Sequence, residues 1–293
     1  MNSEVLSELF HEIDCIDDTI HDLLMYRTEL VETISITNNR KATLSPACEA
    51  QVLRRLTSRH DGQFPKMVIV RLWREIFGAL VGLQGPFALA VYMPGRGGAG
   101  YLALARDQYG AYTPTASYSS VGQVIRAVTD GSATIGILPM PQEDETSPWW
   151  HALASDNTEN PKIVARLPFV GPGPGRGDGI EAVAVACMTP EPSGHDNTFL
   201  LLETSSCMSR ATVRRLIEEV GLKNTVYKGF HAIEGYVYFH LLETPGFITR
   251  FDERLQNLCQ LENNPVTRSV VLGGYAVPLS ATELAGVCNS TPG

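Results

Sequence analysis

An apolar stripe with three-four spacing is the feature of this sequence that most restricts its fold. Leucine and isoleucine recur alternately three and four positions apart over residues 6–34, which predicts one long helix that packs against other helices. One position interrupts the stripe, because Arg27 stands between Leu23 and Leu30 where another aliphatic residue is expected. The other members of the stripe are Leu6, Leu9, Ile13, Ile16, Ile20 and Ile34.

Two interpretations of Arg27 remain open at this point. In the first, the guanidinium lies at the edge of the stripe and reaches water while its aliphatic stem is buried. In the second, the charge is buried and needs an anion, because an unpaired buried charge costs on the order of several kcal/mol. No acidic residue of the same helix lies on the stripe. The anion would then come from another helix, another subunit or a small molecule.

Charge and cysteine usage exclude several classes of partner. The formal net charge of -9 over 293 residues leaves no basic surface to neutralise the phosphates of a nucleic acid. The six cysteines form no CxxC pair, which is typical of reduced thiols in a cytoplasm. The seven histidines show no metal-ligand spacing. We therefore expect no metal and no cofactor.

The N-terminal residues are acidic and already helical in pattern, so they do not resemble a signal peptide. The uncharged stretch 76–93 is interrupted by Gln84-Gly85-Pro86, which predicts a helix end followed by a strand rather than a membrane span. The sequence therefore predicts a cytoplasmic protein without a membrane segment.

Residues 1–84 are expected to be helical throughout. Pro46 stands where a short second helix is expected to begin, and a third helix is expected to end near Gln84. Three such helices have little core of their own, so we expect them to pair with a second copy of the chain as a homodimer. The stripe predicted for the third helix consists of Ile69, Leu72, Ile76 and either Leu80 or Leu83.

Residues 85–195 alternate between strand-like and helix-like stretches, which predicts a central parallel α/β lobe. Residues 143–162 are expected to form an exposed excursion from this lobe. GRGGAG at 95–100 satisfies GxGxxG, but no acidic residue follows about twenty positions later. We expect a tight turn there, with an anion site of backbone amides as the alternative.

Residues 196–293 contain six expected elements in the order βαββαβ, which is the ferredoxin-like plan, followed by a tail. No nucleophile with a base beside it is apparent in this segment. A regulatory or interaction module is therefore the interpretation that we favour for it.

The N-terminal segment resembles the all-helical class of chorismate mutase. In that family the first helix carries the pattern IDxID followed by an arginine, which IDCIDDTIHDLLMYR supplies at residues 13–27. The stretch VGQVIRAVTDGSATIGILPM, residues 121–140, is similar to the first lobe of prephenate dehydratase. The C-terminal segment is similar to an ACT domain. The resemblance implies a mutase-like unit fused to a reduced dehydratase-like lobe and an ACT-like domain.

The resemblance also implies a role for Arg27. Chorismate and prephenate are dicarboxylates, and the rearrangement between them is pericyclic and needs no acid, base or nucleophile. The protein must hold the compact conformer and place cations or hydrogen-bond donors at the breaking ether oxygen. Arg27 would clamp a substrate carboxylate with the bidentate geometry that lysine lacks.

Matched residue by residue, the family's catalytic positions are retained at Arg27, Glu49 and Gln84. Arg40 and Lys41 are expected to bind substrate, because the lysine of the family falls nearby on Asn38.

Three further family positions are changed. Two cationic positions fall on Phe10 and Cys48, and a small hydroxyl residue falls on Leu80. Each lost charged contact would cost about 2–4 kcal/mol of transition-state stabilisation. Whether mutase activity survives is therefore left open.

The dehydratase signatures are reduced further. Thr-Arg-Phe survives only as Asn197-Thr198-Phe199, and Pro139-Met140-Pro141-Gln142 stands in place of Pro-Ile-Glu-Asn. The ACT-like segment lacks the family's Gly-Ala-Leu and Glu-Ser-Arg-Pro elements. We expect no dehydratase activity.

Two functions follow from these observations. The first is a chorismate mutase, an isomerase of phenylalanine biosynthesis in the shikimate pathway, which binds a dicarboxylate of the chorismate or prephenate type. The alternative is a catalytically silent dimeric regulatory or scaffold protein that partners an active enzyme of the same pathway.

Overall fold

The computed structural model describes residues 3–37, 44–143, 145, 148–154, 160–171, 179–233, 237–260 and 266–284. The chain divides into two compact units. The first, the helical unit, consists of Met1–Leu44 and Ala79–Pro86, and the second, the sheet unit, consists of Ser45–Gly78 and Phe87–Gly293. None of the described helices is long and apolar enough to cross a membrane.

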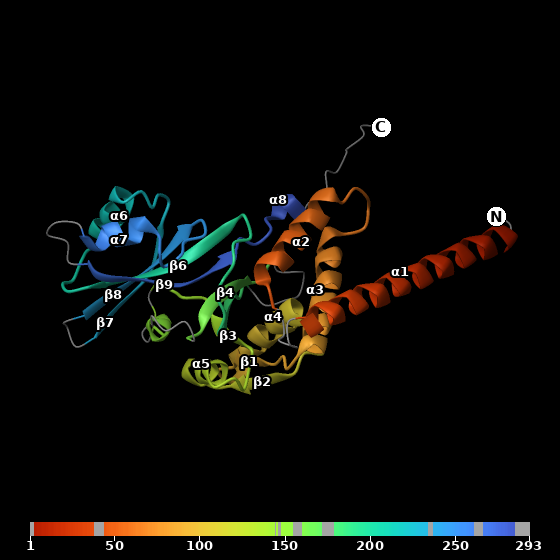
Figure 1. Ribbon diagram of the computed structural model, residues 1–293, viewed down its shortest axis with the longest axis horizontal. Coiled ribbons are helices and arrows are strands. Elements are labelled where there is room, and N and C mark those ends of the chain that lie inside the picture. Colours follow the sequence, from red (N-terminus) through yellow and green to blue (C-terminus); the bar gives the residue numbers. More distant parts are fainter. Residues whose placement is uncertain are drawn as a thin grey trace. The chain divides into compact units, whose positions relative to one another are not determined.

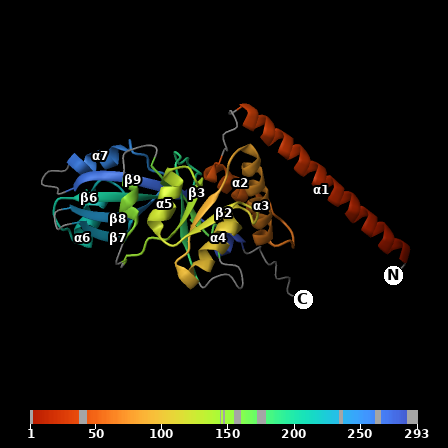
Figure 2. The same ribbon diagram turned by 90° about the horizontal axis from the view of Figure 1, so that it is seen from below.

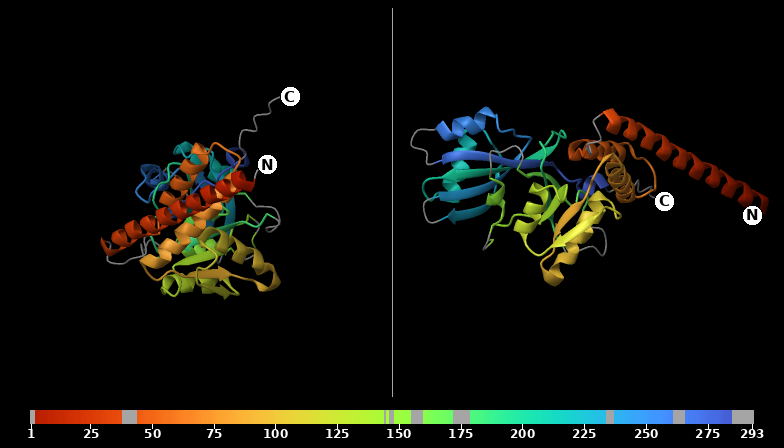
Figure 3. Two further views of the ribbon diagram at one scale, coloured as in Figure 1. Left: turned by 90° about the vertical axis from the view of Figure 1, so that its right-hand side faces the viewer. Right: turned by 60° about the horizontal axis from the view of Figure 1, so that its bottom comes forward.

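The first part of the chain forms the three helices that the sequence predicts. They are α1 (Ser3–Thr37), α2 (Pro46–Arg59) and α3 (Lys66–Gln84), and α1 is one unbroken helix (Figure 3). Pro46 opens α2 as predicted, because a helix start needs no N–H at that position, and the Ser45 side chain accepts a hydrogen bond from the Cys48 backbone N–H. The prediction of a helical N-terminal region is confirmed.

The apolar stripe of α1 lies exposed in this chain. Its members keep between 39% and 62% of their surface accessible, with Leu6 at the lower end and Leu23 at the upper. The covered residues lie next to the stripe and include the stripe position Arg27: Ser35 is buried, and Leu24, Arg27 and Val31 are half-buried. In the helical unit the Ser35 hydroxyl donates to the backbone carbonyl of Gln84 at 3.2 Å, so the end of α1 is tied to the end of α3.

The sheet unit is built on one nine-stranded sheet with the order β2-β1-β3-β5-β4-β9-β6-β8-β7. Its first five strands are β1 (Leu89–Tyr92), β2 (Thr115–Tyr118), β3 (Ile135–Pro139), β4 (Lys162–Leu167) and β5 (Ala182–Ala186). The others are β6 (Asp196–Thr204), β7 (Val226–Ile233), β8 (Val237–Pro245) and β9 (Val266–Ala276). Short elements complete the unit: η1 (Gly95–Gly98), η2 (Trp150–Leu153) and α8 (Ala281–Leu284).

The lobe predicted to be parallel is mixed. Strand β1 pairs in parallel with β2 and β3, and α4 (Ala99–Tyr109) and α5 (Val121–Thr129) provide the crossovers. Figure 2 shows α5 beside β3. Strand β5, however, runs antiparallel to both β3 and β4. The sequence KIVARL of β4 was not recognised as a strand, and no long described helix separates β3, β4 and β5, so these strands can turn back on one another.

The excursion predicted to be exposed contributes to the core instead. Trp150 and Leu153 are fully buried, and Trp149 is 8% exposed. The Trp150 ring packs so close to Gly229 of β7 that an added Cβ there would lie 3.1 Å from the ring. The segment between β3 and β4 buries two indole rings. This apolar burial outweighs the polar composition of its other residues, which had predicted exposure.

The C-terminal elements follow in the predicted order βαββαβ, with α6 (Arg210–Glu219) and α7 (Glu253–Gln260) as the helices. The four strands β9-β6-β8-β7 are antiparallel neighbours. Both helices pack on the same sheet face, where Leu200 and Leu242 meet Leu216 and Leu258 (Figure 1).

A parallel pairing of β4 with β9 joins the two halves of the sheet. Ile163 of β4 is paired with Gly273 of β9, next to a bulge in β9. Gly273 has a φ of +132°, and an added Cβ would lie 2.2 Å from the Ile163 carbonyl oxygen. Glycine is needed here both for its backbone conformation and for the close approach of β4.

Replacement of Gly273 by alanine tests this contact. We expect Gly273→Ala to lower the free energy of unfolding by roughly 2–4 kcal/mol, because the Cβ must push β4 away and the φ is unfavourable for alanine. Gly122→Ala in α5 is the matched control, since an added Cβ there meets nothing within 4 Å. It should be neutral or stabilising by up to about 1 kcal/mol. Urea midpoints of both variants measure the difference, and equal midpoints would contradict this role of Gly273.

Candidate functional site

The predicted site residues fall in both units of the chain. Arg27 and Gln84 belong to the helical unit, and Glu49 belongs to the sheet unit. Arg40 and Lys41, predicted to bind substrate, lie outside the described residues.

In the helical unit, Arg27 is half-buried and Gln84 is 8% exposed. Burial lowers the pKa of the Arg27 guanidinium from its ordinary value. The backbone carbonyl of Gln84 accepts the hydrogen bond from Ser35 described above. Leu80, at the family's small hydroxyl position, is buried, while Phe10, at a lost cationic position, is 64% exposed.

In the sheet unit, Glu49 of α2 forms a buried ion pair with Arg74 of α3. The Arg74 guanidinium donates to Glu49 Oε2 at 2.6 Å, and the two side chains are 4% and 11% exposed, Arg74 being the more buried. Burial raises the pKa of the Glu49 carboxyl, and the charge and hydrogen bond of Arg74 act against this rise. Burial likewise lowers the pKa of Arg74, and Glu49 opposes it.

Other groups of the sheet unit complete the surroundings of Arg74. With the Gln108 amide oriented to satisfy both of its polar atoms, its oxygen accepts from Arg74 at 3.0 and 3.2 Å. The guanidinium also lies over the Phe169 ring, 5.0 Å from the ring centroid. The Tyr109 ring is buried close by, and burial raises the pKa of its hydroxyl. Arg74 is therefore held by a carboxylate, an amide and an aromatic face.

Sequence reasoning missed Arg74, although the signal was the same as for Arg27. The buried positions of α3 are Val70, Arg74, Phe77, Gly78, Leu80, Val81 and Gln84. The predicted stripe was wrong at Leu72, which is 47% exposed, and it did not include Arg74. An arginine at helical spacing between buried aliphatic residues indicates a buried charge that needs a partner.

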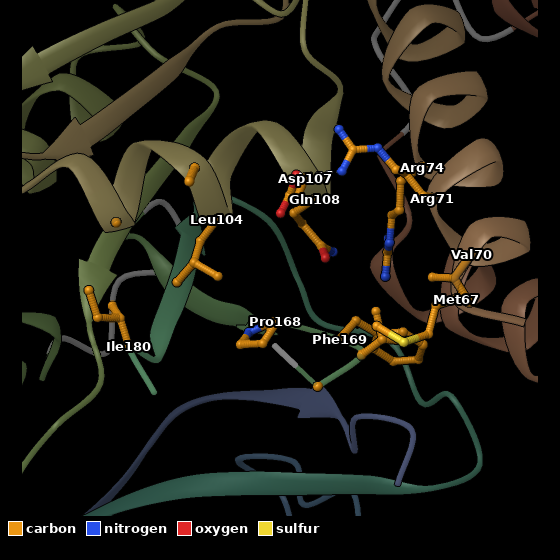
Figure 4. Close-up of a pocket in the computed structure, with 14 residues that line it drawn as sticks. Met67, Val70, Arg71, Arg74, Leu104, Asp107, Gln108, Pro168, Phe169 and Ile180 are labelled. Carbon is orange, nitrogen blue, oxygen red and sulfur yellow. Dashed lines mark hydrogen bonds and ion pairs between the residues drawn. The ribbon is translucent and has the colours of Figure 1, made fainter. Parts of the chain in front are cut away.

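A cavity of about 80 Å³ lies beside this ion pair. Its walls come from α3, α4, the segment Pro168–Gly171 and Ile180, and Figure 4 shows Arg74, Gln108 and Phe169 around it. Arg71, one turn before Arg74, pairs with Asp107 at 3.3 Å. None of the fourteen lining residues carries a hydroxyl, thiol or imidazole. The groups present favour binding and electrostatic stabilisation over covalent catalysis.

The glycine loop at 95–100 forms a close turn before α4. An added Cβ on Gly98 would lie 2.5 Å from the Met93 Cα, and one on Gly100 would lie 2.3 Å from the Ile180 side chain. These approaches account for both glycines by packing, in agreement with the tight turn that the sequence predicts.

In the described part of the chain, no group of three or more histidine, cysteine or acidic side chains is arranged to hold a metal ion. Five cysteines are described there, all exposed and none in a disulfide.

Residues 9–85 match the family model described as chorismate mutase type II. The recognition of this family in the N-terminal segment is thereby confirmed. Among curated proteins, no sequence matches the chain.

Three solved structures are similar to part of the chain. A structure described as GqqA, a novel type of quorum quenching acylases, is 17% identical, with a TM-score of 0.48 and coverage of 68% of this chain and 98% of that chain. Prephenate dehydratase from Arthrobacter aurescens in complex with L-Phe is 15% identical, with a TM-score of 0.45 and coverage of 68% and 92%. Prephenate dehydratase from Streptococcus mutans is 12% identical, with a TM-score of 0.43 and coverage of 66% and 99%. These TM-scores are too low to establish a shared fold.

Replacing Arg74 tests whether the ion pair is structural. Arg74→Leu should cost about 3–5 kcal/mol of stability, because it leaves the Glu49 carboxylate buried without its cation. The loss should shrink as the pH falls toward the unfolded pKa of glutamate, since the raised folded-state pKa then allows Glu49 to be protonated. The double variant Glu49→Leu with Arg74→Leu should recover most of the loss.

Arg71→Leu is the control on the same helix. Its pair with Asp107 is partly exposed, so its removal should cost about 0–1 kcal/mol. Chemical unfolding of the unmodified protein and the three variants at pH 5 and pH 7 measures these differences. A cost for Arg74→Leu no larger than that for Arg71→Leu would show that the pair contributes little.

Proposed function

We propose that this chain, whose residues 9–85 match the chorismate mutase type II family, rearranges chorismate to prephenate in aromatic amino-acid biosynthesis. The family match is the observation that carries the proposal. The half-buried guanidinium of Arg27, at the position where the family has its arginine, supports it further.

In this proposal the reaction proceeds by conformational restriction and electrostatic stabilisation. Arg27 clamps one carboxylate of the substrate through two parallel hydrogen bonds. The Gln84 amide donates to the ether oxygen as its bond breaks, and Glu49 accepts from the substrate hydroxyl. Arg40 and Lys41 bind the second carboxylate. No metal or cofactor takes part.

The Glu49–Arg74 pair suggests how one lost cation is replaced. The arginine that precedes the glutamate in the family is Cys48 here. Arg74 supplies a guanidinium to the same carboxylate from α3, at 2.6 Å. We assign Arg74 the role of positioning Glu49 and setting its charge.

We further propose that the chain is a cytoplasmic homodimer paired through the α1 stripe. The stripe places eight exposed aliphatic side chains on one helix, from Leu6 to Ile34. A helix with so much exposed apolar surface would be costly in a monomer, whereas a second copy would cover it.

For the rest of the chain, we propose a reduced dehydratase-like lobe over 85–195 and an ACT-like domain over 196–293. We expect no dehydratase activity. Thr198, in the remnant of the Thr-Arg-Phe signature, supports this: its hydroxyl donates to the Gly246 carbonyl at 2.7 Å and accepts from the Ile248 N–H at 3.0 Å. A hydroxyl that fixes a loop in this way has a structural role.

The second candidate is the silent regulatory or scaffold protein of the same pathway. What favours it is the buried pairing of Glu49 with Arg74, because each group neutralises the charge that the other would offer to a substrate. The two candidates differ in whether pure protein consumes chorismate.

Substitution of Arg27 tests the mutase proposal. Arg27→Ala should lower the rate of chorismate loss, followed by absorbance, by about 10²–10³-fold, since one charged transition-state contact is removed. Its melting temperature should be retained, so that a loss of rate reports on the contact with substrate rather than on folding. Arg27→Lys should also lose most of the rate, since lysine keeps the charge without the bidentate geometry.

Arg55→Ala, which removes an exposed arginine of α2, is the control and should leave the rate unchanged. Turnover by Arg27→Ala equal to that of the unmodified protein would rule out the clamp. No turnover by the unmodified protein would favour the silent candidate.

Charge placed in the stripe tests the dimer. Ile16→Asp with Ile20→Asp should raise the dissociation constant of the dimer by at least about 100-fold, because unpaired carboxylates would be buried at the interface. Phe64→Asp is matched in exposure, at 52% against 52% for Ile16 and 51% for Ile20, and should leave the dimer intact. Sedimentation velocity at micromolar concentration distinguishes these outcomes. A monomeric unmodified protein would contradict the proposal.

A further inference from the structure

A second cavity, of about 570 Å³, lies in the sheet unit and outside the family match at 9–85. Its size is within the range of small-molecule sites, which bury most of their ligand in an apolar setting with a few polar groups. Its lining comes from β4, β9, the turn Met188–Pro190 and the segment Phe247–Phe251. In Figure 1, β4 and β9 lie side by side at this point, in agreement with their pairing.

The floor of this cavity is the bulged part of β9. The register between β6 and β9 shifts between Val271 and Gly273, so the strand departs from regular pairing there. Lys162 of β4 reaches across and donates to the Val271 carbonyl at 3.1 Å, which fixes its ammonium at the cavity wall. Bulges of this kind often redirect side chains next to binding sites.

The segment Phe247–Phe251, which forms another part of the lining, is fixed at its start. The Thr198 hydroxyl bonds to both Gly246 and Ile248, and the Gly246 N–H donates to the Asp196 carbonyl at 2.7 Å. Ile248 is buried in the core beneath α6 and α7. The start of this segment is therefore held in place without a ligand, which lowers the entropic cost of binding one.

Among the described residues that line the cavity, both charged side chains are cations. Lys162 and Arg250 are the two charged residues of the lining, and no aspartate or glutamate is among the residues that line it. The nearest acidic residue along the chain, Asp252, forms a two-bond pair with Arg254. A ligand with a negative charge is therefore favoured. An ammonium group of a ligand would meet no carboxylate among the residues of the lining.

The remaining lining is suited to an aromatic ring. Phe251 is 68% exposed, and the Arg250 guanidinium lies 4.5 Å from its ring centroid. Phe247, Met188 and Ile248 add aromatic and flexible apolar surface. An exposed phenylalanine at the edge of a preformed cavity can stack on a planar ligand, and Arg250 can bind its charged group.

We propose that this cavity binds an aromatic carboxylate that carries no amino group. The ring packs between Phe247, Phe251 and Met188, and the carboxylate is bound by Arg250 and Lys162. The absence of an acidic group in the lining makes the site select against aromatic amino acids. The site is independent of the mutase proposal, because it shares no residue with it.

Three probes that differ at one group test the proposal by calorimetric titration of the full chain. They are 3-phenylpropanoate, its neutral amide 3-phenylpropanamide, and phenylalanine, which adds an ammonium group to the same skeleton. We expect 3-phenylpropanoate to bind, and the amide and phenylalanine to bind at least about tenfold more weakly. No binding of 3-phenylpropanoate at millimolar concentration, or tighter binding of phenylalanine, would overturn the proposal.

Two variants locate the binding. Arg250→Gln and Phe251→Ala should each weaken binding of 3-phenylpropanoate at least about tenfold, and both lie on an exposed segment, so the fold should be retained. Arg214→Gln removes a cation of 73% side-chain exposure outside this lining and should leave the affinity unchanged. Melting temperatures check the fold of all three. Unchanged affinity in both Arg250→Gln and Phe251→Ala would place the ligand elsewhere and overturn the assignment.

Discussion

A charged group on the apolar face of a helix must be paired, and the buried guanidinium of Arg74 meets this constraint through several elements at once. It donates to Glu49 of α2 at 2.6 Å, lies over the Phe169 ring and donates to the side-chain oxygen of Gln108 of α4. Each of these partners therefore has to keep its place for the charge to remain satisfied. Gly78 allows α3 to approach the end of α4 closely, since an added Cβ there would lie 2.1 Å from the Tyr109 carbonyl oxygen.

The same constraint connects the fold with the proposed chemistry. A pericyclic rearrangement needs fixed cations and donors rather than a nucleophile, so the positions that matter are those where charge is costly to bury. Arg27 is half-buried in α1, and Arg74 is almost fully buried in α3. Cys48 stands where the family has an arginine. In the proposal, Arg74 of α3 compensates for this change by supplying a positive charge to Glu49.

Much of the fold could be predicted from local patterns. The three N-terminal helices, the start of α2 at Pro46 and the order βαββαβ follow from periodicity and from residues that begin or end elements. The direction of β5 could not be predicted, because it depends on β4, whose short sequence is ambiguous by itself. The burial of Trp150 could not be predicted, because it depends on a contact with Gly229, which is distant in the sequence. Among the site residues, Arg27 interrupts a long stripe and is visible in the sequence. Arg74 was missed because the stripe predicted for α3 included the exposed Leu72 and left out the buried Val70 and Phe77 on either side of Arg74.

The most direct test of the account is a crystal structure of the protein with a transition-state analogue of the chorismate rearrangement. The account predicts one analogue carboxylate bound to Arg27 through two hydrogen bonds of about 2.7–2.9 Å, with Glu49 still paired to Arg74 and Gln84 beside the ether oxygen. An analogue bound away from Arg27, with that guanidinium paired instead to an acidic side chain of a second copy, would contradict it.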